Sequence, residues 1–413
     1  MSAPGTGAVQ YRFPRERGRN LGWLWLLLTA LPAMARADWT FSPAEIAAAG
    51  KGVFHHMDAS GRQALALSDG HVAITWEDDR TGVPRCYLGI KAPGQAGFRE
   101  QAFGRGECFA PGITALSNGR FGIIWEDESG VNAAQVQAGA IGEPLGLAVR
   151  GGQGAMAWHP TLGLMAAWTA PEGRWQRLWL ARLKVESGHL DLVEKLHLES
   201  GPIKDDQMYP ALAATASGFA LAWEDRRLGH TVIFSSRTSD GQTWSPPGRV
   251  SQNATGKAQG TDLGRGTGAM RPSLASLGAD RVAAVWLDKR DFLSGYDVYA
   301  ALPESRKNIK AQDSFGDAIA QWHPAVAGTH QGQLVVAWDD DRDGTADIWI
   351  TRLLPQGGFG ENWAPPPAAG PAAQSDPVVV LGETGDLHLA WIERDSSGLS
   401  SIRYSLGITI PKQ

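Results

Sequence analysis

Several prolines in this sequence directly follow side chains that can carry out acid–base or ionic chemistry. Imidazole and phenol groups can exchange protons, a guanidinium can neutralise a carboxylate, and a carboxylate can orient a base or bind a metal. Each Pro also precedes a short apolar segment, and Pro suits the first residue of a strand. With two adjacent histidines near the N-terminus, these residues form the predicted catalytic or ligand-binding set: His159, Tyr209, Arg271, His323, Asp376, His55 and His56. The alternative is that they only hydrogen-bond neighbouring segments.

The segments that must position this set belong to a repeat centred on tryptophan. Seven copies end a short apolar run, at Trp76, Trp125, Trp168, Trp223, Trp286, Trp338 and Trp391. Their mean spacing of about 52 residues lies in the range of a propeller blade. The sequence therefore predicts an all-β fold: a β-propeller of seven blades, each a four-stranded antiparallel sheet. The count falls to six if the third or the N-terminal copy is misread.

The fuller copies of the repeat read Trp-x-Asp-x-Arg, as in 223–227, 286–290 and 338–342. A Trp at a fixed place in every blade can pack between neighbouring sheets, and the Asp–Arg pair can bridge the turn that follows. A catalytic set would not recur in every blade, so this motif is interpreted as structural. We expect the segment 38–42 and the strands near 401–410 to share the last blade, which would close the ring.

The first 37 residues have the features of a secretory signal peptide. Four arginines precede an apolar run over 21–31, and Ala35-Arg36-Ala37 supplies a small-x-small cleavage site. We therefore predict cleavage after Ala37, a mature propeller domain over 38–413 and a periplasmic or secreted location. An uncleaved anchor is the alternative. No second apolar segment is long enough to span a bilayer.

The net charge indicates which partners are unlikely, and the two cysteines indicate the compartment. The chain has a formal net charge of −5, which becomes −9 when the leader and its net +4 are removed. An acidic surface disfavours nucleic acid and anionic membranes as partners. Two cysteines, Cys86 and Cys108, lie 22 residues apart in adjacent repeats. In an oxidising compartment they favour a disulfide between blades one and two over a metal site.

An acidic turn after Trp338 has the spacing of a calcium loop. Carboxylates at loop positions 1, 3, 5 and 9 are Asp339, Asp341, Asp343 and Asp347, with Gly344 at position 6. Calcium prefers several hard oxygen ligands from one turn. Ca²⁺ is therefore the one predicted cofactor, although position 12 is Ile350 and the string coincides with the ordinary repeat turn.

The chain resembles the sialidase-like, or BNR-repeat, β-propeller superfamily. The resemblance rests on the Trp-x-Asp-x-Arg copies and on one string similar to an Asp-box, 236–244, which ends in Asp-Gly-Gln-Thr-Trp. It implies the propeller fold, with the Asp-box in a turn between outer strands. Sialidase chemistry would need three arginines, a Tyr nucleophile and an opening Arg-Ile-Pro motif. Of the three arginines, the starts of the inner strands supply only Arg271. The candidate nucleophile Tyr404 has no clearly paired Glu, and the string most similar to the opening motif, Arg12-Phe13-Pro14, lies in the leader.

The sequence leaves three functions open. The first is recognition of a ligand, most plausibly carbohydrate, at the mouth of the central channel. The second is a glycan-active enzyme. It would be a polysaccharide lyase with Arg271 neutralising a uronate, or a glycoside hydrolase, for which Asp376 is the one carboxylate in register. The third is a scaffold that binds protein across the propeller face and needs no polar pocket.

Overall fold

The computed structural model describes residues 39–57, 60–252, 268–290, 295–303, 305, 307–311 and 319–410. The predicted leader, residues 1–37, lies outside this part of the chain. The described residues form an all-β structure in which the one helical element is a single 3-10 turn, Pro366–Ala368. No helix among them is long and apolar enough to cross a membrane.

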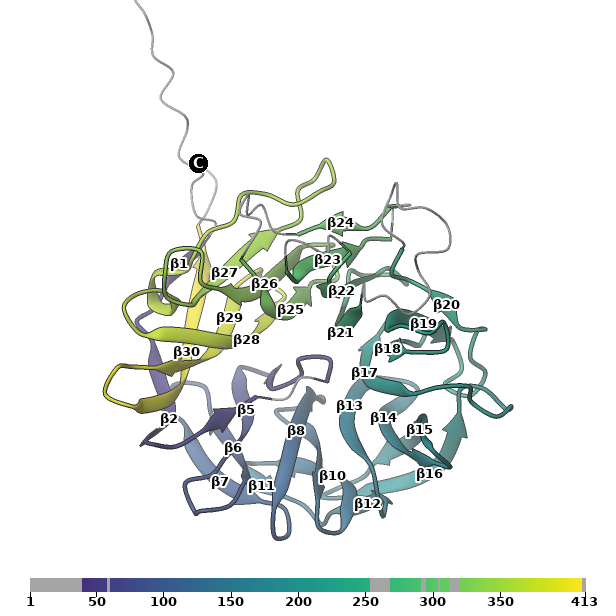
Figure 1. The fold of residues 1–413 in the computed structure, drawn as a ribbon. Helices are drawn as coiled ribbons and strands as arrows, with labels where there is room; N and C mark the ends of the chain where they lie inside the picture. The colour runs from purple at the N-terminus through teal and green to yellow at the C-terminus, as the bar shows by residue number, and fades with distance from the viewer. Residues whose placement is uncertain are drawn as a thin grey trace, which may run out of the picture. The chain divides into compact units, whose positions relative to one another are not determined.

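Seven antiparallel sheets follow one another around a ring (Figure 1). Blade one contains β3(His55–His56), β4(Leu65–Ser68), β5(His71–Asp78), β6(Arg85–Lys91) and β7(Arg99–Phe103). Blade two contains β8(Cys108–Ala115), β9(Phe121–Asp127), β10(Gly130–Gln137), β11(Ala140–Ile141) and β12(Leu145–Ala148). Blade three contains β13(Gly152–His159), β14(Gly163–Glu172), β15(Trp175–Val185) and β16(Leu190–His197). Blade four contains β17(Gln207–Ala214), β18(Phe219–Asp225), β19(Val232–Thr238) and β20(Gly248–Arg249).

The remaining three blades complete the ring. Blade five contains β21(Ala269–Ser276), β22(Val282–Asp288), β23(Asp297–Ala301) and β24(Ile309–Lys310). Blade six contains β25(Trp322–Gly328), β26(Leu334–Asp340) and β27(Asp347–Arg352), and isolated bridges to Phe359 and Trp363 take the place of its fourth strand. Blade seven contains β28(Ala373–Leu381), β29(Leu387–Arg394) and β30(Leu399–Thr409), joined by β1(Trp39–Phe41) and β2(Glu45–Lys51). The predicted seven-bladed propeller is confirmed.

The two ends of the propeller meet in blade seven. β1 pairs antiparallel with β30, with Trp39 opposite Thr409, and β2 continues along the same strand. The first strand of each blade contacts the first strand of the next, from β4 around to β28 and back to β4. The predicted closure is therefore confirmed, and pairing across the seam removes the open edge that an unclosed sheet would expose.

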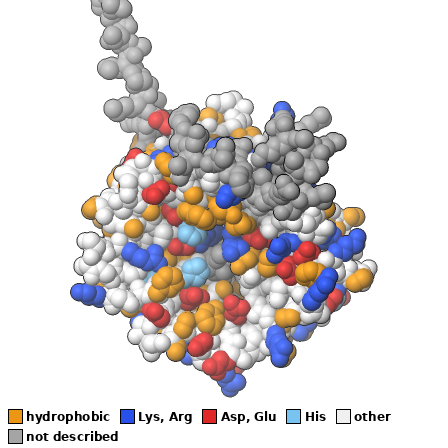
Figure 2. Space-filling view, viewed as in Figure 1, with side chains coloured by type: hydrophobic (Ala, Val, Ile, Leu, Met, Phe, Trp, Pro, Cys, Tyr) orange, Lys and Arg blue, Asp and Glu red, His pale blue; other side chains and the backbone are white. Residues whose placement is uncertain are grey.

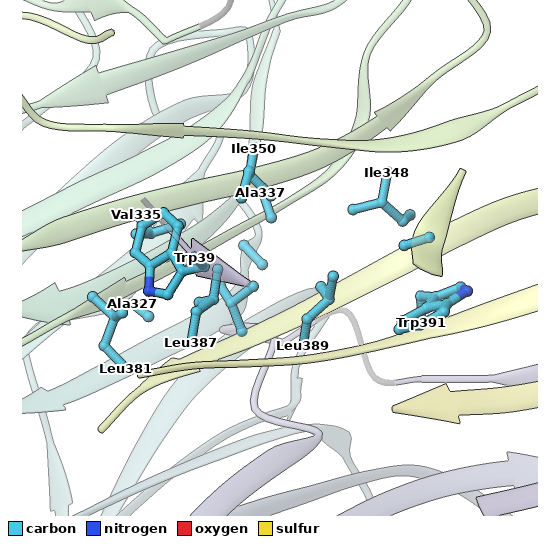
Figure 3. Packing of buried hydrophobic residues seen from close by; sticks show 13 residues of the cluster. Trp39, Ala327, Val335, Ala337, Ile348, Ile350, Leu381, Leu387, Leu389 and Trp391 are labelled. Carbon is cyan, nitrogen blue, oxygen red and sulfur yellow. The ribbon is translucent and has the colours of Figure 1, made fainter. Parts of the chain in front are cut away.

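The seven repeat tryptophans all lie on the second strand of their blades, and each is at most 2% exposed. Each belongs to a hydrophobic cluster that includes residues of the preceding blade, and the cluster of Trp391 contains Ala337 and Ile348 of blade six (Figure 3). The Trp76 cluster likewise contains residues of blade seven, which extends the pattern across the seam. Because a buried Trp contributes several kcal/mol, these side chains join the blades to one another.

The repeated Asp and Arg bridge the turn after the Trp, as predicted. In blade six the Trp338 indole donates to Asp340 over 2.9 Å, and Arg342 donates to the same carboxylate. The same Trp–Asp–Arg arrangement occurs in blades one, four and five. Blade three has Ala170 in place of the Asp, and the Nε1 of Trp168 has no partner in the described structure.

The predicted disulfide is present. Cys86 on β6 and Cys108 on β8 are bonded, with their Cα atoms 5.4 Å apart. The bond joins blades one and two and agrees with an oxidising compartment.

Candidate functional site

One residue in each blade adopts a left-handed backbone conformation near the start of the first strand. In blades two to seven it lies beside a β-bulge, and in blade one it lies in the turn between β3 and β4. These seven residues, which we call the bulge ring, have φ between 48° and 58°: Arg62, Ala110, Gln153, Tyr209, Arg271, His323 and Asp376. A non-glycine residue in this region costs of order 1 kcal/mol, so its recurrence requires support from the surrounding fold. The bulge shifts the register of the strand pairing, as between Met270 and Ser273 in blade five.

A second ring supplies that support. It consists of the residue that follows each repeat Trp, which we call the carboxylate ring because four members are acidic: Glu77, Glu126, Thr169, Glu224, Leu287, Asp339 and Ile392. Three of these acids accept the backbone N–H of the bulge residue in the next blade. Glu77 accepts from Ala110 over 2.7 Å, Glu224 from Arg271 over 2.7 Å, and Asp339 from Asp376 over 3.1 Å. Each bond ties adjacent blades together at the channel mouth.

The two rings enclose a cavity of about 400 Å³ at the centre of the propeller. Histidine, basic and acidic side chains gather at the centre of the face shown in Figure 2. Blades one to six contribute to the lining, so the cavity combines groups that no single blade provides. Its lining residues are His56, Arg62, Glu77, Phe109, Ala110, Glu126, Gln153, Tyr209, Arg271, Leu287 and His323.

Arg271 is held by two neighbours from blade four. Its guanidinium donates to Glu224 over 2.9 Å and lies on the ring of Tyr209, with 3.3 Å between the guanidinium carbon and the ring centroid. Burial raises the pKa of Glu224, against the opposing effect of Arg271. The charge of Arg271 is therefore already balanced inside the protein.

A second cluster joins blades one, six and seven. Arg62 lies 3.3 Å from the carboxylate of Asp376, and His323 bridges Asp339 at 2.7 Å and Asp376 at 3.5 Å. Burial alone would raise the pKa of Asp376, but His323, Arg62 and His56 together hold it below its usual value. Burial lowers the pKa of His56, which favours its neutral form. His56 and His323 are thus the imidazoles available at the cavity.

Glu77 and Glu126 face the cavity without a cationic partner in the described structure. Burial raises the pKa of Glu77, against the hydrogen bond from the Ala110 N–H. Burial, and then the charge of Glu77, raise the pKa of Glu126 to about 7. Glu126 also differs from the other acids of its ring because it caps no bulge N–H among the described residues. A carboxyl group with this pKa can give or take a proton near neutral pH.

Five of the seven predicted site residues lie at the channel mouth: Tyr209, Arg271, His323, Asp376 and His56. The other two do not. His159 ends β13 at the far end of that strand, where its Nε2 contacts Ala216 O at 3.2 Å and its ring packs edge-on against Phe219. His55 is buried between blades, with Nδ1 bonded to Ser400 Oγ at 2.9 Å, and burial lowers its pKa to about 4. Both histidines join blades.

Sequence reasoning missed the residues that complete both rings. Arg62 and Gln153 occupy bulge positions that no Pro follows, so the x-Pro pattern could not find them. The carboxylate ring has a signal in the sequence, because an acid directly follows four of the seven repeat tryptophans. Tyr404, the candidate sialidase nucleophile, is 3% exposed on β30 and contacts His388, away from the cavity lining.

The predicted calcium residues do not act as one group. Asp339 belongs to the channel cluster, whereas Asp347 accepts the Gly370 N–H at 3.0 Å. Asp341 and Asp343 are exposed. Among the described residues, no group of three or more His, Cys, Asp or Glu side chains is arranged to hold a metal. Calcium at this turn stays a prediction, which melting temperatures in calcium chloride and in EDTA would test.

A larger cavity, of about 530 Å³, lies away from the channel, between blades two and three. Its lining is mostly apolar and includes Trp168, Ala170 and Val149. It forms where blade three lacks the Asp–Arg pair of the other blades. The ionisable groups described above do not border it, so the channel mouth is the better candidate for a functional site.

Fold and site together define a β-propeller with a mixed-charge cavity at its channel mouth. No protein-family model and no curated protein matches the sequence. Among solved structures, polysaccharide lyase Uly1 is similar over 84% of this chain and 90% of its own, with 11% identity and a TM-score of 0.54. An α-L-arabinofuranosidase of Fusarium graminearum matches over 72% and 91% of the two chains, with 14% identity and a TM-score of 0.47. At such identities the likeness shows the fold alone.

Proposed function

We propose that this protein binds a carbohydrate at the mouth of its propeller channel. The observation that carries the proposal is the bulge ring: backbone conformation repeats in every blade, whereas the side chains differ. A site that recognises an asymmetric polyhydroxylated ligand needs different donors and acceptors from different blades. The similarity in fold to the polysaccharide lyase Uly1 supports a glycan as the ligand.

Aromatic side chains near the cavity favour the same ligand class. Phe109 lines the cavity, and Trp322, next to His323 in the chain, is 41% exposed and lies against Tyr296 with 5.3 Å between ring centroids. The seven repeat tryptophans are buried between blades, whereas Trp322 is exposed. Aromatic faces can pack against the apolar face of a sugar ring.

Cleavage of a glycosidic bond is the second candidate function, and one observation favours it. Glu126 titrates near neutral pH beside Glu77, and glycoside hydrolases generally use two carboxyl groups with different protonation states. In this scheme Glu126 would protonate the leaving oxygen, while Glu77 would act as base or nucleophile. Product analysis by mass spectrometry on neutral glycans, with Glu126→Gln as the comparison, tests it.

A paired variant experiment tests ligand binding at the channel. Glycan-array screening of the purified protein should give ligands whose binding is lost in Arg271→Ala with His323→Ala. His159→Ala, which alters a histidine outside the cavity, is the matched control and should bind normally. Equal binding by all three proteins would contradict the channel site and favour a scaffold that uses another part of the propeller face.

We also propose export to the periplasm or secretion, directed by residues 1–37. The Cys86–Cys108 disulfide supports an oxidising compartment. N-terminal sequencing of the protein from its native host should give Asp38 as the first residue. A retained leader would indicate an anchor instead.

A further inference from the structure

The charges at the channel mouth do not balance, and we infer that the ligand carries a positive charge, as an amino sugar does. The inference rests on the proposed function and names the ligand class of that same site. Five carboxylates line the cavity or contact its lining: Glu77, Glu126, Glu224, Asp339 and Asp376. The arginines of the lining are two, Arg62 and Arg271.

Both arginines already have a carboxylate partner. Arg271 is paired with Glu224, which is 3% exposed, and its flat face rests on Tyr209. Arg62 is 6% exposed and is paired with Asp376. A uronate would have to compete with these internal carboxylates for the same guanidinium groups. Since breaking a buried ion pair leaves a charge uncompensated, the lining is poorly suited to an anionic sugar.

Glu77 and Glu126 are the acids whose ionised forms a bound cation would stabilise. In the described structure they have no ion pair, and the ionisable group that acts on the titration of Glu126 is Glu77. Around Glu126 lie Gly152 and Gln153 of β13, which carry no charge. Two adjacent acids in a cavity repel each other, and a cation placed between or beside them would relieve that repulsion.

An ammonium group fits this environment chemically. It offers three donors, and charge-assisted hydrogen bonds to carboxylates are stronger than those between neutral groups. The hydroxyl groups of an amino sugar could use Gln153, His56 and His323, while its apolar face could pack on Phe109. These polar and aromatic groups thus suit a sugar, and the unpaired acids Glu77 and Glu126 favour a sugar that bears an amine.

The test compares three tetrasaccharides by isothermal titration calorimetry at about pH 6, where a sugar amine is largely protonated. At this pH Glu126 holds a proton in the free protein, and an ammonium bound beside it should displace that proton. The probes are the glucosamine tetramer, the neutral N-acetylglucosamine tetramer and the anionic galacturonate tetramer. We expect the glucosamine tetramer to bind at least about tenfold more tightly than the neutral one, and the galacturonate tetramer not to bind. Glu126→Gln should remove most of this preference.

Glu383→Gln is the matched control, because Glu383 is an exposed acid on a hairpin away from the cavity. It should leave all three affinities unchanged, and melting temperatures confirm that both variants fold. The inference is overturned if the neutral or anionic tetramer binds as tightly as the glucosamine tetramer, in which case carbohydrate binding itself still stands. It is also overturned if Glu126→Gln leaves the preference intact. If none of the tetramers binds, the carbohydrate proposal fails with it.

Discussion

Replacing Glu126 with Gln should stabilise the protein at neutral and alkaline pH. An ordinary Glu titrates at 4.5, whereas burial and then the charge of Glu77 raise the pKa of Glu126 to about 7. Between these values the folded state holds a proton that the unfolded state has lost. The free energy of unfolding therefore falls as the pH rises from 4.5 to 7, and the loss is complete above pH 7.

The size of the effect follows from the same two values. Their difference corresponds to about 3 kcal/mol, and screening by water at the cavity mouth reduces this to about 2 kcal/mol. Gln has nearly the same shape and no charge at any pH, so it should not carry this cost. For a chain of this length, about 2 kcal/mol corresponds to a rise of roughly 2–3 °C in melting temperature.

Melting temperatures of both proteins at about pH 4.5 and pH 8.5 provide the measurement. The two curves should lie close together at the acidic pH and separate at the alkaline pH, with the variant higher. Glu383→Gln should follow the wild type throughout. A variant that is no more stable than the wild type at pH 8.5 would show that Glu126 is well hydrated or paired, and would refute the reasoning.

Three further predictions concern the site and its framework. A Cβ added by Gly152→Ala would collide with the Glu126 carboxylate, so this variant should weaken ligand binding about tenfold while keeping the acid, as calorimetry can measure. Reduction of Cys86–Cys108 releases a 22-residue loop and should cost about 3 kcal/mol, or roughly 4 °C in a melting scan with and without reductant. His159→Ala should cost about 1–2 kcal/mol in urea unfolding and leave ligand affinity unchanged, because this side chain joins blades three and four.

The fold could be predicted from the sequence because its main determinants repeat. A buried Trp recurs about every 52 residues, and each copy brings the same strand ending and the same turn. The disulfide and the seam between β1 and β30 followed from placing residues in this frame. Blade six shows the limit, because the fourth strand expected of every blade is reduced to isolated bridges there. Outer segments vary most in sequence and leave the weakest pattern.

The site was predicted less well because its defining feature is a backbone conformation. Pro follows the left-handed residue in five blades, whereas Gln63 follows it in blade one and Gly154 in blade three. In blade three, Pro follows His159 at the end of β13 instead of Gln153 near its start. The x-Pro pattern therefore predicted His159 as a site residue and missed Gln153. A left-handed residue is not visible in a sequence when the residue is neither Gly nor Asn.

The same ring explains why the site has an excess of negative charge. A left-handed residue at the channel mouth turns its N–H toward the preceding blade, and an acid after the repeat Trp accepts it in three blades. These three acids support the fold, and two of them, Glu224 and Asp339, are buried. Glu224 contacts Arg271 and Asp339 contacts His323, whereas Glu126 caps no N–H in the described structure and has no basic side chain paired with it there. Among the acids of the carboxylate ring, Glu126 is thus the one whose presence is not explained by a contact that supports the fold. It is the first residue to test for function.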